Sequence, residues 1–443
     1  MALPPEAAAA LERLETFGMN LGLDHVRRLL AALGDPQAGL PAVLVAGTNG
    51  KGSTAALLAG VGTAAGHRTG LYTSPHLEAV EERVRIDGDA IAGADLGALV
   101  LEVVAAAEAT LPAPPTYFEA LTAAALLHFR RRAVELAILE VGLGGRLDAT
   151  NAAEPLVSVI TPIALEHREV LGATPAAIAG EKAGVMRRGR PTVAWDGPPG
   201  VTAALAAAAR AAGADLRRVG GEAATARPLP AAPWEGQEIV LRTAGGPLPL
   251  TVPLLGAHQA ANAALAWAAA AALAETGGWR LDAEAFRRAA ATWRWPARLE
   301  AVALPPTAPA RRVVLDAAHN PHGAAGLARF LDAPPAPFAA PPVLLFGVLS
   351  DKDAGAMLAP LAPLAGPRVL TRPPHPRGRD PRQLLPLLAG EATVLDDPGA
   401  ALDHALGAAA ASGADTVVAC GSIYLVGALR ALLRQRFGVP DPA

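Results

Sequence analysis

The chain lacks three features that would point to common classes of protein. Its single cysteine, Cys420, has no partner for an internal disulfide, and its apolar neighbours favour a buried structural thiol over a catalytic one. No run approaches the roughly 20 strongly apolar residues of a membrane span. The net charge of -3 and the absence of a basic cluster with interleaved aromatics argue against nucleic acid. A small-molecule substrate is the expectation that remains.

Lysine is also scarce. Only three of the 38 basic residues are lysine, namely Lys51, Lys182 and Lys352, and the rest are arginine. An ammonium is a compact point charge that can be chemically modified, whereas a guanidinium is a wide fork that is always charged. Chance explains any one lysine. All three lie in segments that resemble motifs, so we interpret them as positions that require a primary amine.

Length and pattern predict two α/β domains. A chain of 443 residues exceeds what one ordinary core supports. In the first half, apolar runs at 42–46, 136–141 and 156–160 alternate with helical patterns at 53–65 and 116–131, which is typical of a parallel sheet. Pro296 breaks a helical stretch, and the alternation then restarts. We therefore predict domains at residues 1–294 and 295–443.

Further strands and one helix are predicted from the same patterns. Two short runs joined across Gly245-Gly246 indicate a hairpin, and residues 259–274 indicate a helix. The second domain is expected to be an open α/β fold, with strands at 312–315, 343–346, 368–370, 392–395 and 416–419.

The strongest chemical signal is VAGTNGKGS at Val45–Ser53, between a predicted strand and a predicted helix. Glycines let backbone N–H groups approach phosphate oxygens, and a helix N-terminus adds a positive dipole end. In this arrangement Lys51 reaches the terminal phosphates and Ser53 contacts magnesium. The spacing departs from the common GxxxxGK[ST] pattern, and a glycine-rich turn without a ligand is the alternative. The predicted nucleotide contacts of this loop are Gly47, Thr48, Asn49, Gly50, Lys51, Gly52 and Ser53.

This loop resembles the phosphate loop of the Mur ligase superfamily, and further segments resemble its folylpolyglutamate synthase and dihydrofolate synthase branch. They are SPHL (74–77), TYFE (116–119), EVGLGGRLDATN (140–151), GEKAGV (180–185), LLGAHQAANA (254–263), WPARLE (295–300), LDAAHNPHG (315–323), GVLSDKD (347–353) and CGSIYLVG (420–427). They occur in family order over nearly the whole chain.

The resemblance implies a fold and an activity. The fold is a Mur-ligase-like, mostly parallel N-terminal domain followed by a smaller, Rossmann-like α/β domain. The activity is ATP-dependent ligation of L-glutamate to a folate-type carboxylate through an acyl phosphate, in a cytoplasmic enzyme that we expect to be a monomer. The N-terminus carries early acids and does not read as a secretory signal.

A magnesium site is expected beside the loop. Glu140 follows an apolar strand and enters a glycine-rich turn, a position from which a carboxylate can hold nucleotide-bound Mg²⁺. An ordinary strand-end carboxylate is the alternative. The resemblance implies that Ser74, Glu140 and His167 surround magnesium, with two ions expected and Ser53 contributing. The family has Asp where this chain has Glu166, which changes the geometry beside His167.

Lys182 follows Thr174-Pro175 in a predicted helix, and its family counterpart resembles a lysine carbamylated by carbon dioxide. That modification turns the cation into a carboxylate-like metal ligand, which arginine cannot become. A salt bridge with Glu181 or another neighbour is the alternative. Lys51, His167 and Lys182 are thus the residues that the resemblance assigns to catalysis.

Other residues match substrate contacts of the family. Asn262, Arg298 and Asp316 match nucleotide contacts, although Arg298 could serve domain packing and Asp316 could cap a turn. His319 and Ser422 match the glutamate site, with capping roles as alternatives. Phe118 either stacks on the aromatic part of the folate or belongs to the core, since it recurs with Phe129 at helical spacing. Lys352, between Asp351 and Asp353, is interpreted as a locally paired surface charge, and no chemical role is assigned to it.

Two other functions stay open. One is a Mur-type ligase that acts on a cell-wall precursor, because its phosphate loop is similar. The other is a nucleotide switch without ligase activity. The sequence also leaves open whether dihydropteroate, tetrahydrofolates or both accept glutamate, and how long the glutamate tail becomes.

Overall fold

The computed structural model describes residues 3–15, 18, 20 and 22–438. The chain forms two compact units. Unit 1 comprises residues 1–225, 240–250 and 260–293, and unit 2 comprises 226–239, 251–259 and 294–443. The chain therefore passes between the units more than once before the final crossing after Trp293.

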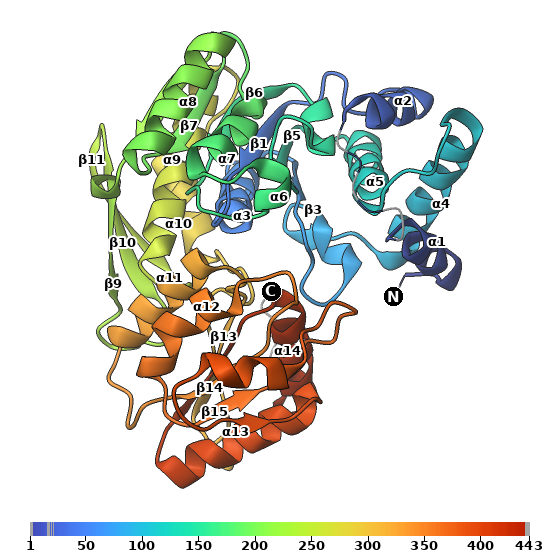
Figure 1. The fold of residues 1–443 in the computed structure, drawn as a ribbon. Helices are drawn as coiled ribbons and strands as arrows, with labels where there is room; N and C mark the ends of the chain where they lie inside the picture. The colour runs from blue at the N-terminus through green and yellow to red at the C-terminus, as the bar shows by residue number, and fades with distance from the viewer. Residues whose placement is uncertain (1–2, 16–17, 19, 21, 439–443) are drawn as a thin grey trace. The chain divides into compact units, whose positions relative to one another are not determined.

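Unit 1 is built on a mostly parallel eight-stranded sheet (Figure 1). The strands lie in the order β4 (Asp89–Ala90), β3 (Val84–Ile86), β2 (Thr69–Tyr72), β5 (Leu136–Glu140), β1 (Ala42–Ala46), β6 (Pro155–Ile160), β7 (Pro191–Trp195) and β8 (Asp215–Val219). Pairs from β2 to β8 are parallel, whereas β3 pairs antiparallel with β2 and β4. Strands β1 and β5 are buried along their whole length, as expected of a parallel sheet covered on both faces.

Helices join these strands and pack against the sheet or one another. They are α1 (Pro5–Glu15), α2 (Asp24–Ala32), α3 (Lys51–Ala64), α4 (Gly93–Thr110), α5 (Tyr117–Arg131), α6 (Arg168–Leu171), α7 (Pro175–Lys182), α8 (Pro199–Ala212), α9 (His258–Glu275) and α10 (Ala283–Ala291). Thr116 caps α5 and shares a reciprocal capping box with Glu119. Residues 119–129 of α5 are all buried, so this helix belongs to the core of unit 1.

The hairpin predicted around the Gly-Gly pair is confirmed. Strands β10 (Gln237–Thr243) and β11 (Gly246–Val252) are neighbours in a three-stranded sheet with β9 (Ala224–Pro228). Gly246 begins β11 with a φ of 102°, a left-handed conformation that glycine adopts without strain.

Unit 2 contains a six-stranded sheet in the order β12 (Glu300–Ala303), β13 (Arg312–Asp316), β17 (Thr416–Cys420), β14 (Val343–Phe346), β15 (Arg368–Leu370) and β16 (Thr393–Val394). All neighbouring pairs are parallel except β12 and β13. The helices of this unit are α11 (Pro321–Asp332), α12 (Ala354–Leu361), α13 (Pro398–Ser412) and α14 (Ile423–Phe437). This is the open α/β fold expected for the C-terminal part.

The predicted strands of both halves are observed within two residues of their expected ends. Short 3₁₀ helices complete the chain at Val80–Arg83, Ala149–Ala152, Ala183–Val185, Gly221–Ala223, Ala362–Leu364 and Pro381–Leu387. Across the described residues, no helix is both long and apolar enough to cross a membrane.

Candidate nucleotide and metal site

Four neighbouring strands of unit 1 bring the predicted site residues to one edge of the sheet. Val45 of β1 is level with Glu140 of β5, and Ala46 is level with Ile160 of β6. Tyr72 of β2 is level with Leu139 of β5. The segments that follow these strands therefore emerge side by side at the carboxyl edge, where open parallel sheets bind ligands.

The phosphate loop leads directly into α3. Gly50 caps the helix with a φ of 88°, and the first helical bond runs from the amide of Thr54 to the carbonyl of Gly50 at 2.9 Å. The amides of Lys51, Gly52 and Ser53 precede this bond, as the first amides of any helix do. Together with the helix dipole they form an anion-binding end of the kind predicted from the sequence.

Thr48 and Asn49 occupy a different position in the loop. Their backbone amides donate to the carbonyl of Pro162 at 3.0 and 3.3 Å, and the Thr48 hydroxyl lies 3.2 Å from the nitrogen and from the oxygen of Ala164. These bonds fasten the first half of the loop to the segment after β6.

Gly47 has a φ of 144°, and a Cβ atom at this position would lie 1.8 Å from the Thr161 Oγ1 and 3.0 Å from the Thr161 nitrogen. Within the described residues, Thr161 Oγ1 is buried and makes no hydrogen bond. Only glycine fits beside this hydroxyl, so the backbone of the loop packs directly against the polar Thr161 side chain at Gly47. Thr161 was not singled out from the sequence, although its place directly after a buried strand was a usable signal.

Lys51, Glu140 and Ser74 lie together. Lys51 Nζ is 4.0 Å from Glu140 Oε1 and donates to the carbonyl of Thr48 at 3.2 Å. Glu140 Oε2 accepts a 3.1 Å hydrogen bond from the amide of Ser74. Glu140 is 5% exposed, so its charge acts in a poorly solvated place where Coulomb interactions are strong.

Lys182 ends α7 and is buried against the phosphate loop. Its Nζ donates to the carbonyl of Gly47 at 2.6 Å. Burial, followed by the charge of Lys51, lowers the pKa of Lys182 to about 7, although Glu166 and Asp148 oppose the shift. Glu181, the neighbour that the alternative named, pairs instead with Arg146 at 2.9 Å. A largely neutral amine at this position is a nucleophile.

His167 adopts a left-handed conformation with a φ of 48° and precedes the short helix α6. The negative charge of the preceding residue, Glu166, is close enough to Lys182 to raise the pKa of that lysine, against the larger effect of burial. The segment that carries both residues thus lies near the phosphate loop. A left-handed non-glycine residue is uncommon and often marks a functional position.

The donor set fits a hard cation held partly by the nucleotide. Glu140 supplies a carboxylate, and Ser53 and Ser74 supply hydroxyls, which are the oxygen ligands that Mg²⁺ prefers. Among the described residues, no three His, Cys, Asp or Glu side chains are grouped to hold a metal by themselves. The residues therefore suit an ion that retains water and phosphate ligands, and do not suit an all-protein cage.

Helices α9 and α10 brace the start of α3. The Asn262 Oδ1 of α9 lies 3.5 Å from the Thr54 hydroxyl. A Cβ atom at Gly50 would lie 2.3 Å from the same Asn262 oxygen. The Trp293 indole, just after α10, donates to the carbonyl of Ser53 at 3.1 Å. Asn262 is thus brought to the phosphate loop, and its role as a nucleotide contact stays a prediction. Trp293 is an additional residue that the sequence analysis missed.

Phe118 lies in α5 beside the turn that follows β5. Its ring centroid is 5.9 Å from that of Tyr72, and a Cβ atom at Gly142 would lie 2.6 Å from its ring. The side chain is half-buried at the margin of the core of unit 1. The ring therefore packs at the margin of the core, and its stacking on the folate stays a prediction.

Asp148 is a buried carboxylate in the same turn. It accepts hydrogen bonds from the Leu143 amide at 2.8 Å and from the Thr150 amide and hydroxyl at 3.0 and 2.5 Å. Burial raises the pKa of Asp148, while Thr150 lowers it. The Asp-x-Thr pattern after a glycine-rich turn is a typical side-chain turn motif and was a missed signal.

Unit 2 joins the WPARLE and LDAAHNPHG segments. Asp316 accepts from the amides of Leu299 and Ala318, each at 2.9 Å. Arg298 stands between two left-handed residues, Ala297 at φ 58° and Leu299 at φ 51°. Burial raises the pKa of Asp316, while Arg298 lowers it. Asp316 thus has the capping role that was one of its two predicted roles. The left-handed residues on both sides of Arg298 fix the backbone position from which its side chain extends.

His319 and Ser422 lie at the same strand ends of unit 2. His319 Nδ1 is 2.9 Å from the carbonyl of Ala317, and the amide of Gly421 donates to the carbonyl of Ala318 at 3.1 Å. Ser422 caps α14 by accepting from the amide of Tyr424 at 3.3 Å. The two segments predicted to form a glutamate site are therefore adjacent.

Lys352 and Cys420 have local partners. Lys352 Nζ is 3.5 Å from Asp351 Oδ2, which agrees with its reading as a paired charge. Cys420 is buried, and burial raises the pKa of its thiol far above the ordinary value. The thiolate that a nucleophile requires is thus disfavoured, as expected for a structural cysteine.

Two family models match the chain. Residues 45–270 match the Mur ligase middle domain, and residues 297–423 match the Mur ligase glutamate ligase domain. The first match covers the phosphate loop, Glu140, Lys182 and Asn262. The second covers Arg298, Asp316, His319 and Ser422.

Two curated relatives are 38% identical to the chain over their aligned residues. A probable bifunctional folylpolyglutamate synthase/dihydropteroate synthase of Haloferax volcanii is 38% identical over 96% of this chain and 50% of its own length. The chain thus spans about half of that relative. A dihydrofolate synthase/folylpolyglutamate synthase of Mycobacterium tuberculosis is 38% identical over 93% of this chain and 89% of its own.

Solved structures are similar over nearly the whole chain. Escherichia coli FolC in complex with DHPP and ADP has a TM-score of 0.83 at 34% identity, with 97% of this chain and 98% of that one covered. A bifunctional folylpolyglutamate synthase/dihydrofolate synthase with Mn, AMPPNP and L-glutamate bound has a TM-score of 0.79 at 34% identity, with 97% and 98% covered. The chain therefore belongs to the folylpolyglutamate synthase/dihydrofolate synthase family of the Mur ligases.

Proposed function

We propose that the chain is an ATP-dependent ligase that joins L-glutamate to a folate-type carboxylate and releases ADP and phosphate. The observation that carries the proposal is the arrangement around the phosphate loop. Lys51, at the N-terminus of α3, lies 4.0 Å from Glu140 at the end of β5, and Lys182 contacts the loop carbonyl of Gly47. This combination supplies phosphate-binding amides, a positive charge and a carboxylate ligand at one edge of the sheet.

The relatives support the choice of substrates. The E. coli relative was solved with ADP and DHPP, and another relative with Mn, AMPPNP and L-glutamate. We infer that this chain takes ATP, a pterin-containing acceptor and glutamate. Residues 1–294 would bind ATP and the acceptor, and residues 295–443 would bind glutamate. Dihydropteroate, tetrahydrofolates or both are candidate acceptors.

In the first step, the acceptor carboxylate attacks the γ-phosphate of ATP, forms an acyl phosphate and displaces ADP. The amides at the start of α3 bind the phosphates, and Lys51 neutralises charge that develops on the transferred group. In the second step, the glutamate amine attacks the acyl carbon. The amine loses its proton, phosphate leaves with the bonding electrons, and an amide remains. No side chain need become a covalent nucleophile.

Magnesium would be held by Glu140, Ser53 and Ser74, with His167 as a further ligand and two ions in total. When bound, it would neutralise phosphate charge and align the γ-phosphate with the attacking carboxylate. Glu140 is positioned for this role by the Ser74 amide, which fixes one of its oxygens. Ser53 is held by the first turn of α3.

We further propose that Lys182 is carbamylated. A pKa near 7 leaves much of the amine neutral at physiological pH, which is the form that attacks carbon dioxide. The nitrogen lone pair bonds to the carbon, and the amine proton goes to water. The product is an anionic carbamate beside the phosphate loop, able to ligate a metal as a carboxylate does.

The second unit would supply the remaining substrate contacts. Arg298 and Asp316 are proposed nucleotide contacts together with Asn262, and His319 and Ser422 are proposed glutamate contacts. Phe118 would present its outer face to the aromatic part of the acceptor. We expect a cytoplasmic monomer that does not bind nucleic acid.

The first experiment measures ADP release by the purified chain with Mg²⁺, ATP and L-glutamate. Dihydropteroate, tetrahydrofolate and no acceptor are compared, and product masses are read in parallel. A mass gain of one glutamyl unit on either pterin supports the proposal. ADP release that ignores both acceptor and glutamate, with no new amide, would refute it in favour of a nucleotide switch. Ligation to a cell-wall precursor alone would favour another Mur-type activity.

A further inference from the structure

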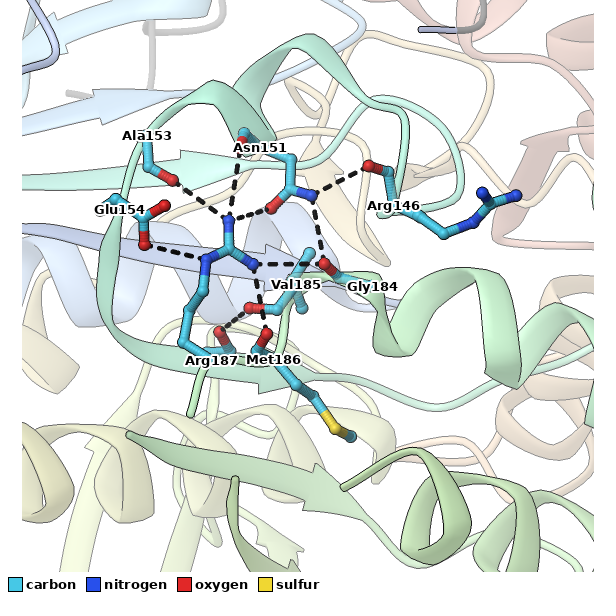
Figure 2. A network of polar contacts seen from close by, with 9 residues as sticks. Arg146, Asn151, Ala153, Glu154, Gly184, Val185, Met186 and Arg187 are labelled. Atoms are coloured by element: carbon cyan, nitrogen blue, oxygen red, sulfur yellow. Dashed lines mark hydrogen bonds and ion pairs between the residues drawn. The ribbon is translucent and has the colours of Figure 1, made fainter. Parts of the chain in front are cut away.

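Arg187, five residues after Lys182, has a guanidinium surrounded by main-chain oxygens (Figure 2). Its Nη1 donates to the carbonyls of Gly184 and Met186, both at 3.3 Å. Its Nη2 donates to Asn151 Oδ1 at 2.8 Å and is within reach of the carbonyls of Asn151 at 3.4 Å and Ala153 at 3.5 Å. Its Nε donates to Glu154 at 3.0 Å. The contacts engage every nitrogen of the guanidinium.

These contacts differ in strength. The Glu154 side chain is 80% exposed, so its ion pair with Arg187 contributes little. The Arg187 side chain is only 20% exposed, and its bonds to carbonyl oxygens are charge-assisted and shielded from water. A lysine offers three donors from one point and cannot reproduce this planar fork. The carbonyl contacts, and not the ion pair, are therefore the reason for an arginine here.

Asn151 links Arg187 to two further segments. Its Nδ2 donates to the carbonyl of Arg146 at 3.0 Å and to the carbonyl of Gly184 at 3.1 Å. Its Oδ1 accepts from Arg187, so both ends of the carboxamide are occupied. The guanidinium fixes which end of the amide points to Gly184. The turn after β5 and the segment after α7 are thereby joined through one side chain.

The joined segments also meet at Lys182. The amide of Arg146 donates to the carbonyl of Glu181 at 3.0 Å, and a Cβ atom at Gly145 would lie 2.7 Å from the carbonyl of Lys182. The turn after β5 thus packs against the backbone of Lys182 without space for a side chain. Any shift of this turn must move the backbone that carries the Lys182 amine.

We propose that Arg187, acting through Asn151 and Gly184, is a positioning residue that holds Lys182 against the phosphate loop. The proposal rests on the proposed function, in which Lys182 contributes to the metal site. Outer residues that orient metal ligands typically change metal affinity or activity by about 10- to 100-fold when they are replaced. Arg187 would act in this way through its bonds to Asn151 and to the Gly184 carbonyl, without contact to substrate.

The test measures Mn²⁺ binding to the ADP-bound full chain by electron paramagnetic resonance, in bicarbonate-containing buffer. Wild type is compared with Arg187→Lys and Asn151→Ser. We expect both variants to raise the Kd for Mn²⁺ by about tenfold, while the Kd for ADP without metal changes less than about twofold. Unchanged Mn²⁺ affinity in the folded variants, with only a lower Tm, would overturn the proposal, because it would leave Arg187 a purely structural role.

Glu154→Gln is the matched control. It removes the charge that pairs with Arg187 and keeps the carbonyl contacts, so Mn²⁺ affinity is expected to match wild type. The binding measurement requires neither folate nor glutamate. Wild type that binds Mn²⁺ but ligates no glutamate would therefore refute the proposed function, while the comparison of Kd values still decides the role of Arg187.

Discussion

Lys182 Nζ lies 2.6 Å from the carbonyl oxygen of Gly47, so the amine at the end of α7 contacts the first residue of the phosphate loop. The two residues are 135 positions apart in sequence. The contact places a buried amine with a pKa of about 7 beside the predicted nucleotide site. It is the closest link between the loop and the segment that carries the proposed carbamate.

Lys182→Arg should abolish most ligase activity while nucleotide binding persists. Arginine keeps the positive charge but cannot form a carbamate, and loss of a metal ligand costs several kcal/mol, or at least about 100-fold in kcat. Wild type should require bicarbonate after carbon dioxide is removed, whereas the variant should not respond to it. A ¹³C carbamate signal from labelled bicarbonate, present only in wild type, is the direct measurement. Equal activity of both proteins would contradict the carbamate.

Gly47→Ala should destabilise the protein by about 1–3 kcal/mol and weaken ADP binding. The new Cβ atom would overlap Thr161 Oγ1, and the backbone at residue 47 would have to keep a positive φ that alanine disfavours. Urea unfolding and ADP titration measure the two effects. Gly407→Ala is the matched control, since Gly407 lies within α13 with no atom within 4 Å of an added Cβ. This control should gain about 0.5–1 kcal/mol from helix propensity. A harmless change at Gly47 would mean that the loop does not need its observed shape.

Burial, followed by Arg83, lowers the pKa of His76 to about 4. His76 Nδ1 accepts a 3.0 Å hydrogen bond from Arg83 Nε, which requires an unprotonated nitrogen. Between pH 6.5 and 4 the unfolded state binds more protons at this site, so the stability that His76 confers is lost as pH falls through this window. Because His76 is partly exposed, we expect an effect of about 1–2 kcal/mol.

His76→Gln keeps an acceptor for Arg83 and removes the titration. Its free energy of unfolding should fall less than that of wild type between pH 6.5 and 4, as measured by urea unfolding at several pH values. The exposed His404 provides a control through His404→Gln. Parallel pH curves for wild type and His76→Gln would show that His76 does not contribute.

Trp293→Phe should lower stability by about 1–3 kcal/mol, because it removes the indole donor to the Ser53 carbonyl and part of a buried ring. Trp267→Phe controls for ring size, since Trp267 packs edge-on against Phe286 at a centroid distance of 5.2 Å. Thermal unfolding and ADP affinity are measured for both. A weaker ADP affinity in Trp293→Phe alone would connect this bond to the phosphate loop. Equal losses in both variants would assign the effect to packing.

Much of the fold was predictable because local rules and global structure agree. The run at 343–346 is strand β14 as predicted, since a short apolar run bounded by turn residues is typical of a buried parallel strand and is too short for a helix. Helix α5 was predicted from the helical spacing of its apolar residues, but burial of Thr122 and His128 was not, because it depends on tertiary packing. Thr122 lies 3.2 Å from the Tyr72 hydroxyl inside the core.

The phosphate loop was predictable for a similar reason. Its glycines, lysine and serine lie close together in sequence between a strand and a helix, so residue type and spacing sufficed to predict the loop, although distant segments help to hold it. Arg187 and Trp293 were not predictable, because many of their partners are main-chain carbonyls, which carry no sequence signal, and the side-chain partners of Arg187 lie more than 30 residues away. Thr161 was missed because its importance depends on the φ of Gly47, which lies on a different strand end.

The sequence by itself determined the two α/β patterns, the phosphate loop and the retention of three lysines, since each depends on residue type and near-neighbour spacing. Only the tertiary structure decided that the Lys182 amine contacts the Gly47 carbonyl and that the Ser74 amide bonds to Glu140. The same is true of the bonds from Arg187 to the carbonyls of the segment that follows Lys182. The first two contacts join residues far apart in the chain. They arise from the register of parallel strands and from burial, which sequence spacing does not encode.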